Sequence, residues 1–360
     1  MYRFLIISLF ISIVFSWNAD GKGLTTNSKK LKTPPRIIRT CCAFGSDVGI
    51  VGIPFFRYTE VTSIDEIGKH AYLGDRDERN GILYTCKGGF VDLGHLRDQA
   101  DWTAYMHYMI THHKGEKITI KLGREGGVKR LTLMVPDTIS NDDAVRLAGR
   151  IAYDLSVWHE IATWYGVSAV PLVPERYSAF SIEDDYSNLL GVNLSMKAIK
   201  SDQPYEEAMT GVLAQTLDNL GVVSSEKETL DAMEQVENEW WTRDKKLPSR
   251  KILMVRDIST YTGASPRLVP GWCESDDPVA VDLPLETEEN QPLTDFYELD
   301  FKMNGKFPYR KIFPDKKGRG ITEKDFQVLL EKVTEDINHR TEEDNLREMK
   351  KKERKEARKG

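Results

Sequence analysis

The sequence predicts an α+β fold, in which a central helical bundle carries short β-hairpins packed on it. Apolar residues recur at three- and four-residue spacing over several long segments, which is typical of amphipathic helices. Two shorter segments alternate apolar and polar residues around a glycine-rich turn, which indicates a β-hairpin. Aromatic residues make up 9% of the 360 residues, enough large side chains to fill a sizeable core.

The helices are expected where the apolar residues follow a helical period. The first long helix begins at Leu93. Its apolar stripe consists of Trp102, Tyr105, Met106 and Met109. The second begins at a cap formed by Asn141 or Asp142 and ends at Gly166, because glycine readily adopts the left-handed conformation that ends helices. Further helices are expected at residues 63–69, 182–196, 205–220, 225–241 and 321–338.

The strands are expected in short alternating segments. Residues 117–122 and 128–135 form the predicted hairpin, and residues 82–85 follow an Asn-Gly turn as another strand. Residues 252–260 also alternate like a strand. Between residues 263 and 315, proline and acidic residues are frequent and periodicity is weak, so we expect a long structured loop or a linker.

Composition limits the class of protein. The chain has 50 Lys and Arg against 56 Asp and Glu, and its formal net charge is −6. Nucleic-acid binding needs a clustered basic surface, so we expect no nucleic-acid partner. Hydrophobic residues at 40% and charged residues at 29% indicate a globular protein rather than a disordered or polytopic membrane protein.

The N-terminus has the pattern of a signal peptide. Arg3 gives a positive start, and residues 4–15 form an almost unbroken apolar run. This run is shorter than the about 20 residues that span a bilayer, but it suits the hydrophobic region of a signal. We expect residues 1–16 (or as far as residue 19) to be removed, which predicts a periplasmic or secreted protein whose mature chain has no transmembrane span.

The remainder of the chain divides into three expected parts. Residues 34–300 form a single main α+β domain, and residues 301–338 form a C-terminal extension that ends in a helix. Residues 339–360 form a charged tail, since they are nearly all Lys, Arg and Glu and cannot bury enough apolar surface to offset their ordering entropy. We expect this tail to be exposed to solvent. A less favoured interpretation is that its basic residues contact an anionic surface.

The sequence contains four cysteines, namely Cys41, Cys42, Cys86 and Cys273. Export permits disulfides, and adjacent cysteines rarely bond each other because the peptide between them would be strained. We therefore expect Cys86 and Cys273 each to pair with one of the two adjacent cysteines, in an order that the sequence leaves open. Two alternatives are weaker: a metal site lacks the CxxC spacing, and Cys86 as a nucleophile rests only on its place at a strand exit beside Lys87.

Three segments carry residues that are suited to chemistry. His95 lies at the start of the first long helix. His159 extends the core face of the second long helix, and Glu160 is rotated by about 100° from it. Glu183 and Asp184 belong to a group of carboxylates at a later helix start, where a helix dipole also favours them.

These residues predict a metal site, since a buried histidine or carboxylate costs free energy unless something pairs with it. A catalytic zinc ion takes a few imidazole or carboxylate ligands, an open position for water and a nearby base. The expected ligands are His95, His159 and Glu183, with zinc as the candidate ion. Glu160 is the expected catalytic base. Asp98 and Asp184 are expected to support these ligands or to replace one of them.

The sequence thus favours an exported metal-dependent hydrolase that acts on an unidentified envelope or extracellular substrate. The His159-Glu160 pair resembles the start of an HExxH motif, but Thr163 stands where the second histidine is needed, so the zincin interpretation fails. The alternative is a non-catalytic envelope protein that binds a glycan or a protein partner. In that case a histidine beside tryptophan is only hydrogen-bonded to a carboxylate.

Four short motifs complete the sequence pattern. They are Thr40-Cys-Cys-Ala-Phe-Gly45, Gly88-Gly-Phe-Val-Asp92 followed by His95, Trp158-His-Glu160 and Tyr186-Ser-Asn-Leu-Leu-Gly191. As a set they resemble a family of exported bacterial proteins catalogued as a domain of unknown function, over residues 34–299. The resemblance implies export and a single continuous domain, and it implies no reaction, fold or ligand.

Overall fold

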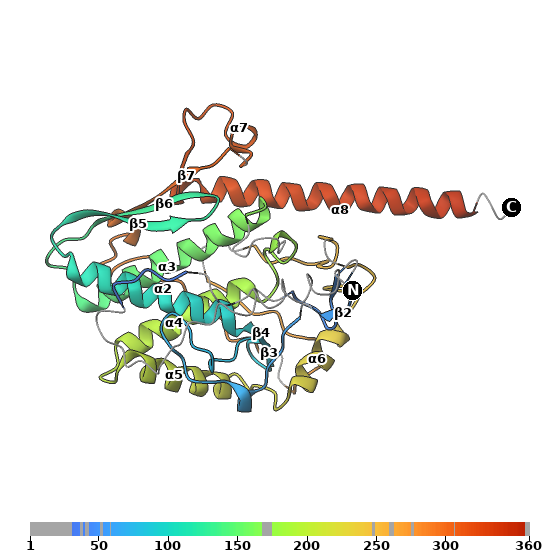
Figure 1. Ribbon diagram of the computed structural model, residues 1–360, viewed down its shortest axis with the longest axis horizontal. Coiled ribbons are helices and arrows are strands. Elements are labelled where there is room, and N and C mark those ends of the chain that lie inside the picture. Colours follow the sequence, from blue (N-terminus) through green and yellow to red (C-terminus); the bar gives the residue numbers. More distant parts are fainter. Residues whose placement is uncertain are drawn as a thin grey trace, which may run out of the picture.

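The fold is α+β, as the sequence predicts (Figure 1). The structure, a computed structural model, describes residues 31–36, 39, 43–50, 53–57, 59–167, 175–246, 249–258, 263–274, 277–305 and 307–356. The expected signal peptide, Cys41 and Cys42 lie outside the described residues.

Helices form the centre of the molecule. α2 (Leu93–His112), α3 (Asn141–Trp164) and α4 (Asp184–Ile199) pack against one another, and α5 (Tyr205–Asn219) packs on α4 (Figure 1). α6 (Glu226–Gln235) lies against β3 (Ile82–Thr85). The main hydrophobic core is therefore built around α2, which is buried over most of its length.

Side-chain caps fix where the two long helices begin. Asp92 Oδ1 accepts hydrogen bonds from the backbone N–H groups of Gly94 at 2.7 Å and His95 at 3.2 Å. Ser140, one residue before the expected cap, accepts from the N–H of Asp143 at 2.9 Å. Such bonds satisfy N–H groups that have no partner within the helix. The cap at Asp92 also fixes His95 in the first turn of α2.

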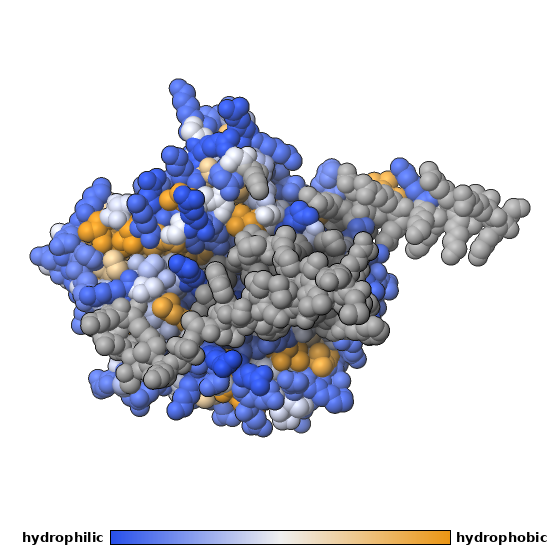
Figure 2. Space-filling model, in the orientation of Figure 1, coloured by the Kyte–Doolittle hydropathy of each residue, from blue (hydrophilic) through white to orange (hydrophobic). Residues whose placement is uncertain are grey.

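A four-stranded antiparallel sheet covers one side of the helices (Figure 1). Its strands, in spatial order, are β5 (Lys117–Arg124), β6 (Gly127–Met134), β7 (Tyr297–Met303) and β8 (Gly320–Thr322). On its inner face Phe301 stacks on Trp158 of α3, with ring centroids 4.2 Å apart. Figure 2 shows apolar side chains gathered over the β5–β6 hairpin on an otherwise mainly hydrophilic face.

Two small hairpins lie away from the four-stranded sheet (Figure 1). β1 (Gly49–Ile50) pairs with β2 (Ile53–Arg57), and β3 (Ile82–Thr85) pairs with β4 (Gly89–Asp92). β4 runs directly into α2, so the second hairpin sets the position of the first turn of that helix. Short helical turns occupy Ile64–Glu66, Glu175–Tyr177, Leu293–Asp295, Tyr309–Ile312 and Glu323–Asp325.

α8 (Phe326–Glu356) starts in the core and then projects from the body of the molecule (Figure 1). Its first turns bury Phe326 and Val333, whereas Leu346 and Met349 are exposed. The domain boundaries expected at residues 300 and 338 stay predictions, and β7 and α8 cross them. None of the helices in the described part of the chain combines the length and apolarity that crossing a membrane requires.

Some elements differ from expectation. Residues 63–69 form only a short turn, and the helix expected at 225–241 ends at Gln235. Residues 252–258 do not form the expected strand, because their backbone pairs with the loop at 240–242 through only a few hydrogen bonds. The region at 263–315, in which little regular structure is expected, contains β7.

Cys86 and Cys273 form a disulfide with each other, with a Cα–Cα distance of 5.6 Å. The predicted pairing of each with Cys41 or Cys42 is therefore wrong, and Cys86 is not a free nucleophile. The partners are 187 residues apart, and the loop that carries Cys273 is held at β3 because Val269 N–H donates to the Tyr84 hydroxyl at 2.9 Å. The spacing of the cysteines in the sequence does not indicate that Cys86 pairs with Cys273.

Candidate metal centre

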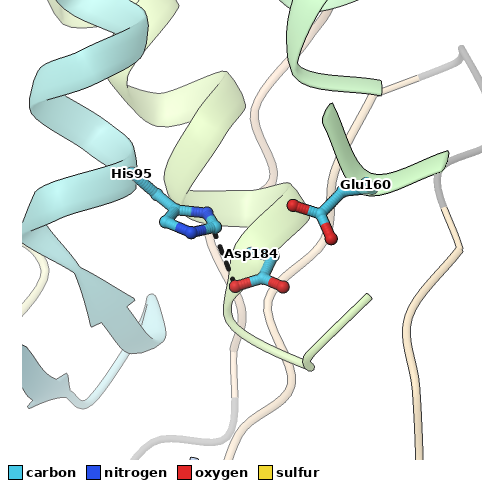
Figure 3. A group of neighbouring side chains, drawn as sticks. All are labelled: His95, Glu160 and Asp184. Atoms are coloured by element: carbon cyan, nitrogen blue, oxygen red, sulfur yellow. Dashed lines mark ion pairs between the residues drawn. The ribbon is translucent and has the colours of Figure 1, made fainter. Parts of the chain in front are cut away.

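His95, Glu160 and Asp184 converge in the interior of the molecule, from α2, α3 and α4 (Figure 3). Each offers one ligand atom, and these atoms all lie within 4.8 Å of one another. All three side chains are buried. His95 Nδ1 lies 3.4 Å from Asp184 Oδ1, which is longer than an ordinary hydrogen bond.

Backbone hydrogen bonds hold the two carboxylates in place. The N–H of Phe180 donates to Glu160 Oε2 at 2.7 Å, and the N–H of Ser181 donates to Asp184 Oδ2 at 2.8 Å. The chain segment before α4 thus joins α3 to α4. Because a carboxylate has two oxygens, each group can make its backbone contact and still offer a ligand atom.

A glycine contact brings α4 close to α2. A Cβ atom on Gly191 would lie 2.0 Å from the backbone oxygen of Leu96, so no larger residue fits there without displacing a helix. Leu96 follows His95 directly, and Gly191 lies seven residues after Asp184 on the same helix. The close approach of these backbones therefore helps to set the distance between the two side chains.

Two more buried carboxylates, Asp92 and Glu183, adjoin the three residues. Ser181 Oγ donates to Glu183 Oε2 at 2.5 Å, whereas Glu183 Oε1 and Asp92 Oδ2 have no hydrogen-bond partner within the described residues. Burial raises the pKa of Asp184 well above its usual value, and repulsion from Glu160, Glu183 and Asp92 raises it further. A cation stabilises buried carboxylates that repel one another in this way.

The nearby guanidinium of Arg256 does not fill that need. It donates to the backbone carbonyls of Ala179, of Tyr177 at 3.0 Å and of Arg250 at 3.2 Å. Burial and the charge of Arg250 lower the pKa of Arg256 to about 10, against the opposing effect of the carboxylates. Two of these three hydrogen bonds go to the loop that presents Phe180, and the third goes to Arg250.

His159 lies beside the three ligand atoms rather than among them. Its Nδ1 is 2.6 Å from Glu125 Oε1, and its ring centroid is 6.3 Å from that of His95. Lys129 Nζ donates to the other oxygen of Glu125 at 2.7 Å. Burial opposes protonation of His159, but Glu125 outweighs burial and raises the pKa of His159 to about 9. Likewise, Lys129 and His159 outweigh the burial of Glu125 and lower its pKa to about 2.

Asp98 belongs to a separate group of charges. Arg39 Nη1 donates to Asp98 Oδ1 at 2.6 Å and to Asp101 Oδ2 at 3.0 Å, and its other nitrogens donate to Glu78 at 2.8 Å. Burial raises the pKa of Asp98 to about 7, although Arg39 opposes this shift. Asp98 therefore holds the N-terminal segment against α2 through Arg39.

Sequence reasoning named every member of the three-residue group and the adjoining Glu183, but it did not find Glu125, Lys129 or Arg256. Glu125 stands in the glycine-rich turn of the β5–β6 hairpin, and Lys129 lies on the inward face of β6. The one signal for Lys129 was its charge at an inward position of an alternating strand. Neither the partner of Glu125 nor the place of Arg256 follows from residue spacing.

A family model matches residues 29–270, a range that includes all three ligand residues. The chain belongs to that family. Its description is "Protein of unknown function (DUF4056)", so membership in DUF4056 assigns no reaction. No curated protein and no solved structure shows a significant match to this chain.

The donor set of this DUF4056 protein suits a divalent ion. One imidazole and two carboxylates are ligands that Zn²⁺ accepts, and three protein ligands leave a position for water. Ligands about 2.0–2.2 Å from a tetrahedral ion lie roughly 3.4 Å apart. The His95 Nδ1 to Asp184 Oδ1 distance of 3.4 Å is close to this value, whereas the three ligand atoms together lie within 4.8 Å, so the side chains would draw closer around an ion.

Proposed function

We propose that this DUF4056 protein is an exported metal-dependent hydrolase in which His95, Glu160 and Asp184 hold one divalent ion. The observation that carries the proposal is the convergence of three buried potential ligands, from three different helices, within 4.8 Å. Zinc is the first candidate, because it accepts both imidazole and carboxylate ligands.

Glu183 is the proposed base in this arrangement. A bound divalent ion would supply a water molecule of lowered pKa. Glu183 is buried next to the ligand Asp184, and its Oε1 has no hydrogen-bond partner in the described part of the chain. That oxygen can accept a proton, while Ser181 holds the other oxygen. Glu160, for which the sequence favoured the role of base, is a ligand in this proposal.

Two observations support export to the periplasm or the outside of the cell. The apolar run at residues 4–15 follows a basic residue, as in signal peptides. The disulfide between Cys86 and Cys273 is typical of oxidising compartments. The substrate would accordingly be an envelope or extracellular molecule.

A specific observation favours a second candidate, a non-catalytic envelope protein. Glu160 and Asp184 each accept a backbone N–H from the segment before α4. These contacts alone give both carboxylates a structural role. In that case the residues would tie the helices together and no ion would be required.

Metal analysis of the purified full-length mature protein separates the two candidates. We expect about one zinc ion per chain, and at least tenfold weaker zinc binding in Asp184→Asn and Glu160→Gln, since each variant removes a charged ligand but keeps an oxygen for the backbone N–H. Asp185→Asn is the matched control, because Asp185 is adjacent but contacts the Tyr153 hydroxyl at 2.7 Å.

Equal zinc content in the wild type and both ligand variants, or no binding of added zinc or manganese, would overturn the metal centre. Circular dichroism of each variant verifies folding. Hydrolysis is then measured on simple chromogenic esters, amides and phosphate esters, with and without chelator. A protein that binds the ion but hydrolyses none of them counts against a catalytic role for the ion.

A further inference from the structure

A pocket of about 390 Å³ lies beside His159, between the β5–β6 hairpin, α2 and α3. It is lined by Pro35, Arg36, Trp102, Leu122, Gly123, Arg124, Glu125, Lys129, His159, Thr163 and Val167. Small-molecule sites in proteins typically have volumes of about 300–1,000 Å³. The pocket is thus large enough for a small ligand.

The lining of the pocket is positively charged. Lys129 and His159 are buried in its wall, and Arg36 and Arg124 are exposed at its edge. Glu125 is the acidic residue in the lining, and it lies between the two buried groups. The lining thus contains three Lys or Arg side chains and one carboxylate, in addition to His159.

Lys129 is the most informative of these residues, because burying an ammonium group is costly. Its Nζ donates to Glu125 at 2.7 Å and lies 5.5 Å from the centroid of the Trp102 ring. An ammonium group has three N–H donors, and this hydrogen bond uses one of them. A ligand with negatively charged oxygens would provide acceptors for the others.

We propose that this pocket binds the anionic group, a carboxylate or a phosphate, of a small-molecule ligand through Arg36, Arg124 and Lys129. Oxygens of either group accept charge-assisted hydrogen bonds from guanidinium and ammonium donors. The pocket is distinct from the metal centre, since none of its lining residues is one of the three proposed metal ligands.

In a step that rests on the proposed function, we infer from the location of His159 that this ligand is the substrate of the hydrolase. The His159 ring lines the pocket, and its centroid is 6.3 Å from that of His95 at the metal centre. An anion bound beside His159 would leave the rest of a small molecule within reach of the metal centre. The substrate is thus an anionic compound whose scissile bond lies a few bonds from its charged group.

Calorimetric titration of the full-length mature protein with inorganic phosphate and, separately, with acetate tests the pocket. Each titration is done on chelator-treated and on zinc-loaded protein. We expect binding of at least one of the two anions without zinc, and about tenfold weaker binding in the Arg36→Gln/Arg124→Gln double variant. Both arginines are exposed, so this variant is expected to fold normally.

Arg130→Gln is the matched control. Arg130 follows Lys129 on β6, but it pairs with Asp300 at 2.8 Å on the outer face of the sheet. Its loss removes the same charge per substitution, and we expect the affinity for the anion to remain within about twofold of the wild type.

A preference for phosphate or for acetate supports the proposal and identifies the charged group. Binding of neither anion, binding only in the zinc-loaded protein, or equal affinity in the double variant would overturn it. The two proposals fail separately. If the protein binds no metal ion but still binds the anion, the hydrolase proposal is wrong and the anion-binding pocket stands. If it binds the metal ion but not the anion, only the pocket proposal is wrong.

Discussion

His159 Nδ1 lies 2.6 Å from Glu125 Oε1, so a histidine of α3 pairs with a carboxylate from the turn of the β5–β6 hairpin. The adjacent residue on the helix, Glu160, belongs instead to the group with His95 and Asp184. Two neighbouring residues of α3 therefore serve two different polar regions. One region is rich in carboxylates, and the other is the cationic pocket.

Glu125→Gln should lower the free energy of unfolding by about 3 kcal/mol, because it removes the charge that two buried cationic partners share. Glu125→Gln/Lys129→Met should recover part of this loss, since the unpaired ammonium is removed as well. Denaturant unfolding of the wild type, the single variants and the double variant measures the interaction. A double variant whose loss equals the sum of the two single losses would contradict the coupling of these residues.

Gly191→Ala should destabilise the protein by about 1–3 kcal/mol, because the added methyl group would meet the backbone oxygen of Leu96 and separate α4 from α2. Gly211→Ala is the matched control. Gly211 lies within α5 with nothing within 4 Å of its Cβ position, so alanine should stabilise the protein by about 0.5–1 kcal/mol. Thermal unfolding of both variants provides the comparison, and shifts of the same sign would be inconsistent with it.

Stability should rise with pH between about 4 and 6.5 in part because of His107. Burial, with smaller contributions from Lys114 and His112, lowers the pKa of His107 from 6.5 to about 4. In this pH range the unfolded chain binds a proton that the folded protein excludes, so acidification favours unfolding. His107→Gln should therefore reduce the difference in unfolding free energy between about pH 5 and about pH 7.

The control for this measurement is His113→Gln, on the partly exposed histidine that lies 3.0 Å from Glu116. This variant measures the change that substitution of another histidine near the end of the same helix causes. An unchanged pH dependence in His107→Gln would show that His107 does not contribute.

Cys273→Ser should lower the free energy of unfolding by about 2–5 kcal/mol, because the disulfide with Cys86 restricts the unfolded chain. Cys86→Ser should cause a similar loss, and the double variant should lose little more than either single variant. Peptide mapping without reducing agent should recover the two cysteines in one linked peptide pair. A map that links Cys86 to another cysteine would contradict the structure.

Elements with a strong local period were predictable from the sequence. The stripe from Trp102 to Met109 gave α2, and alternation around a glycine-rich turn gave β5 and β6. β7 was missed although Tyr297–Met303 alternates buried and more exposed residues, because charged residues occupy its outer positions and the expected domain boundary divided it. The expected strand at 252–260 failed in its described part because alternation does not supply a partner strand.

The candidate site was predictable only in its residue types. Histidines and carboxylates on apolar helix faces indicated a buried polar group, and His95, Glu160 and Asp184 do meet. The partner of each residue was not predictable, because Glu125 and Arg39 reach their contacts through turns and loops far away in the sequence. Periodicity defines a face of one helix, but it does not define what another segment places against that face.

The bond between Cys86 and Cys273 has a consequence for how the protein is made. Cys41 and Cys42 leave the ribosome before Cys86, and Cys273 leaves it last. Oxidation in order of emergence would join Cys86 to one of its earlier neighbours, and that link would have to be exchanged before the chain could mature. In an oxidising compartment, an enzyme that reshuffles disulfides would speed this exchange, and a host without one should accumulate more mispaired protein.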